Sequence, residues 1–303
     1  MTARVLITGA SGFVGGHLAR EVAAAGSELL AVSRRGTSVA GEGRAVDLLD
    51  PSAIEAAVAD FQPTVVYHLA ALASTGRSWQ DPARCVGDNQ TTTWNLLEAV
   101  RTNAPDATVV VAGSGESYGA PLGLPVDEQH PLAPATPYAV AKTVTDLVGG
   151  LFAEAHGLRV IRARAFNQIG PDQGKSFLLG SIASQLKEQA GEQSAVVLTG
   201  SADVRRDYTD VRDVVRAMRL LVEAGELGAF NICSGHSLST AEIVTAATEA
   251  SAPLTVVHEV DPRLVRPHET DDIVGDPAKL IAATGWQPLI PLSQSVSDAL
   301  ASA

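Results

Sequence analysis

The sequence predicts an α/β protein: a doubly wound parallel sheet with a smaller α/β domain towards the C-terminus. Three observations predict this fold class. Short β-branched runs alternate with helical segments, a glycine-spaced turn joins the first run to the first helix, and the regular alternation ends near residue 166. At 303 residues the chain is long enough for one large α/β unit with a smaller one appended.

Strands are expected where runs are apolar over their whole length. These runs are "RVLITG" (4–9), "ELLAVS" (28–33), "TVVYHLA" (64–70), "ATVVVAG" (107–113) and "LRVIRAR" (158–164). Continuous apolar strands are typical of a parallel sheet that helices cover on both faces.

Helices are expected between these strands. The helical segments are 12–26, 50–61, 89–103 and 137–157. The second has the clearest start, with Asp50 as N-cap and Pro51 in the first turn. Repeated strand–helix–strand units predict the parallel, doubly wound arrangement.

The second half has longer loops and an irregular pattern, which predicts a separate smaller domain. We expect residues 1–165, together with about 207–233, to form the first domain. The second domain is then expected to comprise residues 166–206 and 234–303. The segment 207–233 is assigned to the first domain because its helix can still lie against the main sheet.

Composition excludes several classes of partner. A net charge of −12 argues against nucleic acid or an anionic membrane, because an acidic surface repels phosphates. The two cysteines, Cys85 and Cys233, are far apart and lack a metal-type spacing, so we expect reduced thiols and no metal site. The N-terminal residues lead straight into a strand with no signal-like segment, and the longest apolar run, 65–73, is too short for a membrane helix. We expect a cytoplasmic protein.

The turn "ITGASGFVGGHL" predicts a dinucleotide site of the Rossmann type. Gly9 allows the tight turn, Gly12 lets the backbone approach a pyrophosphate at the helix N-terminus, and Gly15 allows close packing of helix on strand. Glycines at this spacing are weak evidence alone. Their place between the first strand and the first helix makes the prediction specific.

The end of the second strand favours NADP(H) over NAD(H). An acid there would bind a ribose 2′-hydroxyl, whereas this chain has Ser33, Arg34 and Arg35, and arginine forks suit a 2′-phosphate. Two exposed arginines without a ligand remain the alternative. Asp47, in "VDLLD", is placed to accept a hydrogen bond from an adenine amino group, or is simply an acid before a helix.

Tyr138 and Lys142 lie on one helix face because they are four residues apart. A phenol has an ordinary pKa near 10, and a neighbouring ammonium is expected to lower that pKa by favouring the phenolate. Ser114 adds a hydroxyl that can bind a carbonyl oxygen. The three groups predict carbonyl reduction or alcohol oxidation with hydride from a nicotinamide.

The motifs T-G-x-x-G-x-x-G, "HLAA" (68–71), "SGESYG" (114–119) and Y-x-x-x-K resemble the extended short-chain dehydrogenase/reductases over the whole chain. Within that superfamily the second half is similar to reductases of GDP-6-deoxy-4-keto-D-mannose, in stretches such as "RARAFNQIGPDQ" (162–173), "RRDYTDVRDVVRA" (205–217) and "LVRPHE" (264–269). The chain departs from the pattern of this group at two places. It has Gly115 where the group often has a second serine, and its "NQTTTWN" (89–95) lacks a small glycine that the group often has after the asparagine.

The resemblance implies roles for individual residues. Catalytic roles fall to Ser114, Tyr138 and Lys142. The implied cofactor contacts, besides Tyr138 and Lys142, are Gly9, Ser11, Gly12, Phe13, Val14, Gly15, Ser33, Arg34, Arg35, Asp47, Leu48, Leu69, Ala70 and Ala71. The implied substrate contacts are Ser114, Glu116, Asn167, Arg206, Arg266 and Glu269. A surface ion pair is the alternative for each arginine.

The resemblance implies NADPH-dependent reduction of the C4 ketone of a nucleotide-linked 4-keto-6-deoxy sugar, with GDP-4-keto-6-deoxy-mannose giving GDP-rhamnose as the leading case. Glu116 leaves a 4,6-dehydratase or epimerase open, because related dehydratases use an acid at this offset. A non-catalytic NADP-sensing protein is the remote alternative. The superfamily further implies a homodimer through a four-helix bundle, although both helices concerned could simply pack on their own sheet.

Overall fold

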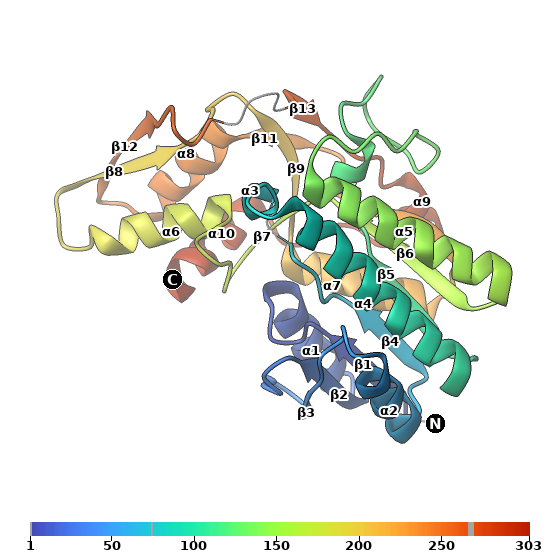
Figure 1. Ribbon diagram of the computed structural model, residues 1–303. Coiled ribbons are helices and arrows are strands. Elements are labelled where there is room, and N and C mark those ends of the chain that lie inside the picture. The colour runs from blue at the N-terminus through green and yellow to red at the C-terminus, as the bar shows by residue number, and fades with distance from the viewer. Residues whose placement is uncertain (1, 74, 266–269) are drawn as a thin grey trace.

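The computed structural model describes residues 2–73, 75–265 and 270–303. Within these ranges the centre is a seven-stranded parallel sheet of order β10-β6-β5-β4-β1-β2-β3 (Figure 1). Its strands are β1 (Arg4–Thr8), β2 (Glu28–Ser33), β3 (Glu42–Ala45), β4 (Val65–His68), β5 (Thr108–Ala112), β6 (Arg159–Ala165) and β10 (Gly228–Ile232). The strand order reverses between β1 and β4, which is where such sheets bind ligands. The predicted fold class is confirmed.

Helices cover both faces of this sheet, as the continuous apolar strands require. One face carries α1 (Phe13–Ala24) and α7 (Val211–Glu223), and the other carries α2 (Pro51–Phe61), α4 (Pro82–Asn103) and α5 (Pro137–His156). Successive side chains of β1 pack alternately into the cores on the two faces of the sheet. Val5 and Ile7 pack into the core under α1 and α7, whereas Leu6 packs into the core under the other three helices.

One helix start differs from the prediction. The sequence predicts a helix from residue 89, but α4 begins seven residues earlier, at Pro82. Asp81 caps it by accepting a hydrogen bond from the Arg84 backbone N–H at 3.2 Å. The Asp–Pro pair is the same start signal as Asp50–Pro51, so the sequence contained this information.

The C-terminal part forms a second lobe beside the sheet, at the upper left of Figure 1. It contains a four-stranded sheet and a parallel two-stranded pair. The strands of the sheet are β7 (Asn167–Ile169), β9 (Arg205–Asp210), β11 (Ser237–Ser239) and β13 (Asp272–Ile273), and those of the pair are β8 (Ser194–Thr199) and β12 (Thr255–Val260). Its own apolar core lies among α6 (Leu178–Glu188), α8 (Thr240–Ala250) and α10 (Leu292–Ser302).

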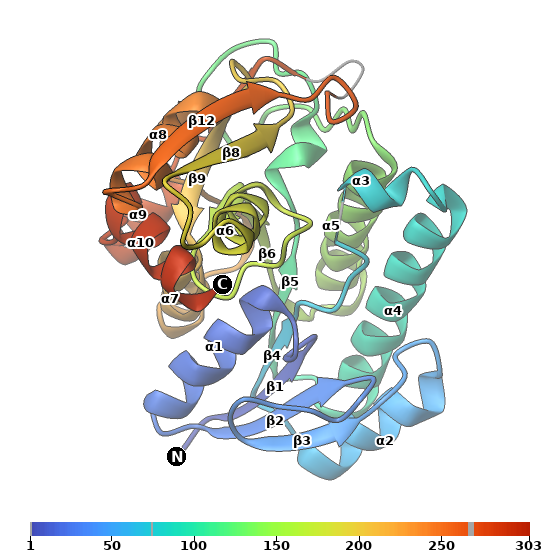
Figure 2. The same ribbon diagram turned by 90° about the vertical axis from the view of Figure 1, so that its left-hand side faces the viewer.

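Three short elements complete the fold. The helix α3 (Thr75–Ser78) and the 3₁₀ helix η1 (Gly115–Tyr118) follow β4 and β5, respectively. The helix α9 (Ala278–Thr284) returns to the main sheet, where Leu280 and Trp286 join the core under α1 and α7. In Figure 2, α6 and β8 lie above α1 and the main sheet. Across the described ranges, the helices are all too short or too polar to span a bilayer.

Candidate active site

A cavity of about 1500 Å³ lies where the second lobe meets the turns that follow the parallel strands. It brings together predicted residues from distant parts of the sequence. These are Gly9, Ser11, Gly12, Phe13, Val14, Gly15, Ser33, Arg34, Asp47, Leu48, Leu69, Ala70, Ala71, Ser114, Glu116, Tyr138, Lys142, Asn167 and Arg206. Arg35 is exposed and is not part of the lining, and Arg266 and Glu269 lie outside the described residues.

The glycine turn forms a close-fitting cradle at one end of the cavity. Gly9 has a positive φ of +71°, and a Cβ there would lie 2.7 Å from the backbone nitrogen of Ala70. A Cβ at Gly15 would overlap the Gly9 carbonyl oxygen. Gly12 caps α1, so the free N–H groups of the first helical turn face the cavity side of the turn. The cradle therefore fits the pyrophosphate of a dinucleotide.

Arg34 lies at the edge of this cradle with a free guanidinium. Its side chain is exposed, and within the described residues it makes no hydrogen bond or ion pair. Ser33 is buried and donates a hydrogen bond to the Thr37 carbonyl at 3.3 Å. Asp47 accepts from the Leu49 N–H at 3.0 Å and still lines the cavity. The residues present thus fit a 2′-phosphorylated dinucleotide, with Arg34 as the available cation.

His68, in "HLAA", supports the floor of the site from below. Its Nδ1 lies 2.9 Å from the Thr8 hydroxyl and its Nε2 lies 3.1 Å from the Thr93 hydroxyl. Burial, together with the charge of Lys142, lowers the pKa of His68 to about 3. The imidazole is therefore neutral and ties β1 to β4 and α4 beneath the cradle.

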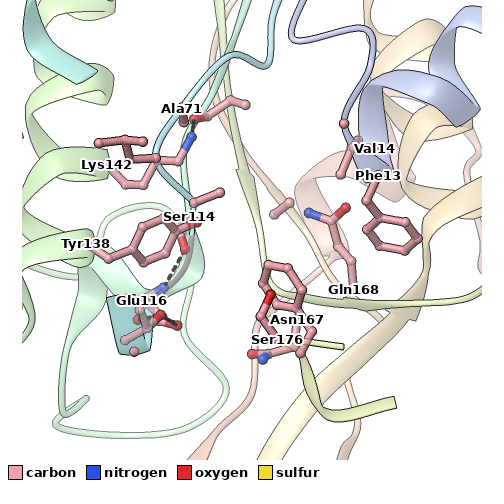
Figure 3. A pocket seen from close by; sticks show the side chains of 18 of the residues that line it. Phe13, Val14, Ala71, Ser114, Glu116, Tyr138, Lys142, Asn167, Gln168 and Ser176 are labelled. Carbon is pink, nitrogen blue, oxygen red and sulfur yellow. Dashed lines mark hydrogen bonds between the residues drawn. The ribbon is translucent and has the colours of Figure 1, made fainter. Parts of the chain in front are cut away.

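Ser114, Tyr138 and Lys142 converge beyond the cradle (Figure 3). Tyr138 and Lys142 lie in the first turns of α5, which Thr136 caps by accepting from the Ala139 N–H at 3.0 Å. The Ser114 side chain is hydrogen-bonded to Tyr138 and accepts from the Glu116 N–H at 3.2 Å. The Lys142 ammonium donates to the Ala112 carbonyl at 2.8 Å.

Burial dominates the electrostatics of this group. It raises the pKa of Tyr138 above its ordinary value, the Glu116 carboxylate raises it further, and the hydrogen bond from Ser114 opposes the shift. Burial also lowers the pKa of Lys142 to about 8. The expected lowering by Lys142 is not among the causes of this shift, and desolvation, the largest cause, makes the net shift in the pKa of Tyr138 upward. Tyr138 is held as a protonated phenol, which is the form that donates a proton.

Glu116 lies beside Tyr138 with its carboxylate held by α3. The Thr75 hydroxyl donates to it, 3.0 Å from Oε1 and 3.3 Å from Oε2. The preceding residue, Gly115, packs against the Phe166 ring, and a Cβ there would lie 2.8 Å from a ring carbon. The absence of a second serine at this position is thus linked to the buried Phe166.

The second lobe supplies the far wall of the cavity. Asn167 begins β7, directly opposite Ser114 and Tyr138 (Figure 3). Arg206, on β9, donates through Nη1 to the carbonyls of Arg205 at 2.7 Å and Thr270 at 2.8 Å. These bonds hold the arginine at the cavity wall.

Among the lining residues that sequence reasoning missed are Gln168 and Thr75. The side-chain oxygen of Gln168 is buried without a hydrogen-bond partner among the described residues, and Figure 3 shows the side chain between Phe13 and Asn167. A buried amide oxygen without a partner points to a ligand. Gln168 lies within the stretch 162–173, which resembles the reductases. The same resemblance that indicates a ligand contact for Asn167 could therefore have indicated one for Gln168.

The glycine cradle, the Ser–Tyr–Lys group and the parallel sheet define an extended short-chain dehydrogenase/reductase. A family model described as GDP-mannose 4,6 dehydratase matches residues 6–299, and the chain belongs to that family. The resemblance found in the sequence is therefore confirmed.

Three relatives show what this chain is similar to. GDP-6-deoxy-D-mannose reductase of Pseudomonas aeruginosa is 36% identical, with 98% of this chain and 95% of that protein covered. A solved structure of RMD from Pseudomonas aeruginosa complexed with NADPH has a TM-score of 0.83 and 32% identity, with 99% and 98% of the two chains covered. UDP-glucose 4-epimerase of Thermus thermophilus, in complex with NAD, has a TM-score of 0.87 and 28% identity, with 98% of each chain covered.

Proposed function

We propose that this chain is an NADPH-dependent reductase of the C4 ketone of a nucleotide-linked 4-keto-6-deoxy sugar, with GDP-4-keto-6-deoxy-mannose as substrate and GDP-rhamnose as product. The observation that carries the proposal is the position of the Ser114 and Tyr138 side chains between the dinucleotide cradle and the wall bearing Asn167 and Arg206. The full-length similarity to a GDP-6-deoxy-D-mannose reductase supports the choice of substrate.

Bound NADPH would supply the hydride to C4, and the chain supplies the proton and the orientation. The Tyr138 phenol donates a proton to the carbonyl oxygen as the C4 alcohol forms. Ser114 donates a hydrogen bond to the same oxygen and so aligns the ketone. Lys142, with its pKa of about 8, is largely cationic at neutral pH and favours the phenolate that remains.

The remaining contacts follow from the cavity. Arg34 would bind the cofactor 2′-phosphate, the glycine turn its pyrophosphate, and Gln168 the nicotinamide end. Asn167 and Arg206 would hold the diphosphate and sugar of the substrate. Arg266 and Glu269 keep the substrate role that the resemblance implies, and Arg35 keeps an auxiliary one near the 2′-phosphate. NADP(H) is preferred over NAD(H) because Arg34 is the cation available at the ribose.

The test is NADPH oxidation with GDP-4-keto-6-deoxy-mannose that a separate dehydratase produces in situ, with GDP-mannose alone as the control. Loss of NADPH only with the ketosugar, together with GDP-rhamnose as the product, supports the proposal. If NADPH is not consumed with either sugar, the proposal is contradicted.

Glu116 favours one second candidate, a 4,6-dehydratase or epimerase. Its carboxylate lies beside Tyr138, where a base that removes a ring proton would be needed. The same assay separates the two functions, because a dehydratase would convert GDP-mannose into the ketosugar with no net loss of NADPH. A non-catalytic NADP-sensing protein would bind NADPH and turn over neither sugar.

We also propose two functional domains, residues 1–165 with about 207–233 for the dinucleotide, and residues 166–206 with 234–303 for the nucleotide sugar. Because β9 (Arg205–Asp210) pairs within the sheet of the second lobe, the segment that returns to the first domain begins at α7, with Val211. The separate apolar core of α6, α8 and α10 supports this division. The packing of Leu280 and Trp286 on the main sheet ties the second domain firmly to the first. Cytoplasmic location is part of the proposal, supported by Cys85 and Cys233 as free thiols.

A homodimer through α4 and α5 completes the proposal. The two helices lie side by side (Figure 1), and each exposes large apolar side chains: Trp94 is 44% exposed, Leu147 56% and Leu151 47%. Four helices from two copies would bury this surface. The double variant Leu147→Glu/Leu151→Glu should be a monomer by light scattering, whereas Leu122→Glu, at a loop residue that is 95% exposed, should leave the dimer intact. A wild-type monomer would contradict the dimer.

A further inference from the structure

The loop between β7 and α6 forms part of the far wall of the cavity. Gln173 fixes this loop in place: its amide N–H donates to the Gln168 carbonyl at 2.6 Å, and its amide oxygen accepts from the Gly180 N–H at 3.2 Å. Figure 3 shows Ser176, from the same loop, on the wall that carries Asn167. The loop therefore has a defined position beside the residues expected to contact the substrate.

Lys175, in this loop, lines the cavity with an unpaired ammonium. Its side chain is exposed, and it makes no hydrogen bond or ion pair with any residue that the structure describes. Arg263, another cation in the lining, differs in this respect, because both carboxylate oxygens of Asp261 accept from its guanidinium, at 3.0 Å from Nε and 2.7 Å from Nη2. The Lys175 ammonium is therefore available to bind an anion in the cavity.

The charge of the whole protein makes such a cation important. With a net charge of −12 the surface repels anions on average, so the binding of an anionic ligand depends on cations placed at the cavity itself. A nucleotide sugar carries a negative charge on each phosphate of its diphosphate. Lysine binds phosphate as a point charge. Arg206 lies in the same lining, and two cations suit a ligand with two charged phosphates.

We infer that Lys175 is a substrate-binding residue: its ammonium contacts the diphosphate of the nucleotide sugar. This inference rests on the proposed function and deepens it, because it assigns a contact that the resemblance does not imply. The other diphosphate in the cavity would be that of the cofactor, at the glycine cradle. Figure 3 shows Ser176 on the Asn167 side of Gln168, away from Phe13 in the cradle, which favours the substrate.

Lys175→Met tests the inference, because methionine keeps an unbranched side chain and removes the charge. We expect the dissociation constant of GDP, measured by calorimetry at low salt, to rise about fivefold. KM for the ketosugar should rise by a similar factor with kcat nearly unchanged, since the diphosphate does not react. Added salt should weaken GDP binding less in Lys175→Met than in the wild-type protein, because one ionic contact is missing. Lys175→Arg keeps the charge and should restore both constants.

Lys187→Met is the matched control. Lys187 lies in the last turn of α6, is not part of the cavity lining, and donates to the backbone oxygen of Ala303. Its removal changes the net charge of the protein equally, so GDP binding should stay as in the wild-type protein. The dissociation constant of NADPH should be unchanged in both variants.

Three results would overturn the inference: unchanged GDP binding in Lys175→Met, an equal loss in Lys187→Met, or a loss of NADPH affinity in place of GDP affinity. The first would leave Lys175 without a ligand, the second would reduce its effect to net charge, and the third would assign it to the cofactor. If the wild-type protein binds no GDP, the proposed function fails together with the inference. GDP binding that does not depend on Lys175 overturns the inference alone.

Discussion

Arg164 and Asp146 form a buried, two-pronged ion pair between β6 and α5. The Arg164 Nε donates to Oδ1 of Asp146 and its Nη2 donates to Oδ2, both at 2.9 Å. Asp146 lies one helical turn beyond Lys142, and Arg164 also donates to the Tyr118 hydroxyl at 3.0 Å. The pair thus joins the helix of Tyr138 and Lys142 to η1, which carries Glu116.

Asp146→Ala should lower the free energy of unfolding by about 3–5 kcal/mol, because it leaves the Arg164 guanidinium buried without its counter-charge. Asp146 and Arg164 are only 1% and 5% exposed, so water cannot replace the lost carboxylate. Urea unfolding followed by circular dichroism measures the change.

The control for this prediction is an ion pair in water. Glu98 and Arg101 form an exposed pair on α4, and Glu98→Ala should cost less than about 1 kcal/mol. Similar small losses in both variants would show that the buried pair does not stabilise the fold.

Tyr138→Phe should reduce turnover of the ketosugar below detection and leave NADPH affinity within about threefold. The phenol is the proton donor, whereas the cradle that binds the cofactor is made by other residues. Stopped-flow NADPH oxidation and NADPH fluorescence titration measure the two effects. Tyr67→Phe, the same change in the core of β4, should retain activity. Activity retained by Tyr138→Phe would remove the tyrosine from the mechanism.

The sequence predicted the large sheet well, because whole-length apolar strands and capped helices are local signals. The start of α4 at Pro82 was missed although Asp81–Pro82 repeats a signal that was used at Asp50. The irregular second lobe gave no such periodicity. Its short strands, such as β7 at Asn167–Ile169 and β13 at Asp272–Ile273, are held by pairing with β9, and this pairing is invisible in local sequence.

The candidate site also contains residues that local sequence signals predict and residues that only the folded structure brings together. Residues within motifs, such as Gly9 and Tyr138, could be found because spacing along the chain fixes their geometry. Thr75 could not, because its role depends on contact with Glu116, 41 residues away in sequence. The shift in the pKa of Tyr138 was also out of reach, since it depends on how deeply the folded chain buries the phenol.

Arg34→Ala should weaken NADPH binding about 10–100-fold and leave NADH binding nearly unchanged, as expected for a lost charged hydrogen bond to the 2′-phosphate. Arg34 lines the cavity, whereas Arg35 does not. Since the contact proposed for Arg35 is only auxiliary, Arg35→Ala should weaken NADPH binding less than Arg34→Ala does, by under about threefold. The double change of Arg34 to Asp and Arg35 to Gly should shift the preference towards NADH in calorimetric titrations. An unchanged preference would mean that neither arginine meets the 2′-phosphate.

His68 should make the folded protein sensitive to acid below pH 6.5. The pKa of this buried imidazole is about 3 when folded, against an ordinary value of 6.5 when unfolded. Between these values the unfolded chain binds a proton that the folded chain does not, so stability is complete above pH 6.5 and is lost as pH falls towards 3. At pH 5 the loss from this one group should reach about 2 kcal/mol.

His68→Gln isolates this contribution, because glutamine can keep hydrogen bonds to Thr8 or Thr93 and does not titrate. The difference in unfolding free energy between pH 7 and pH 5, from urea titrations, should be about 2 kcal/mol smaller in the variant than in the wild-type protein. The same replacement at His156, an exposed residue at the end of α5, should leave the wild-type difference in place. Equal acid sensitivity in His68→Gln and the wild-type protein would mean that His68 takes up its proton without unfolding the chain, and that its bonds to Thr8 and Thr93 do not require the neutral imidazole.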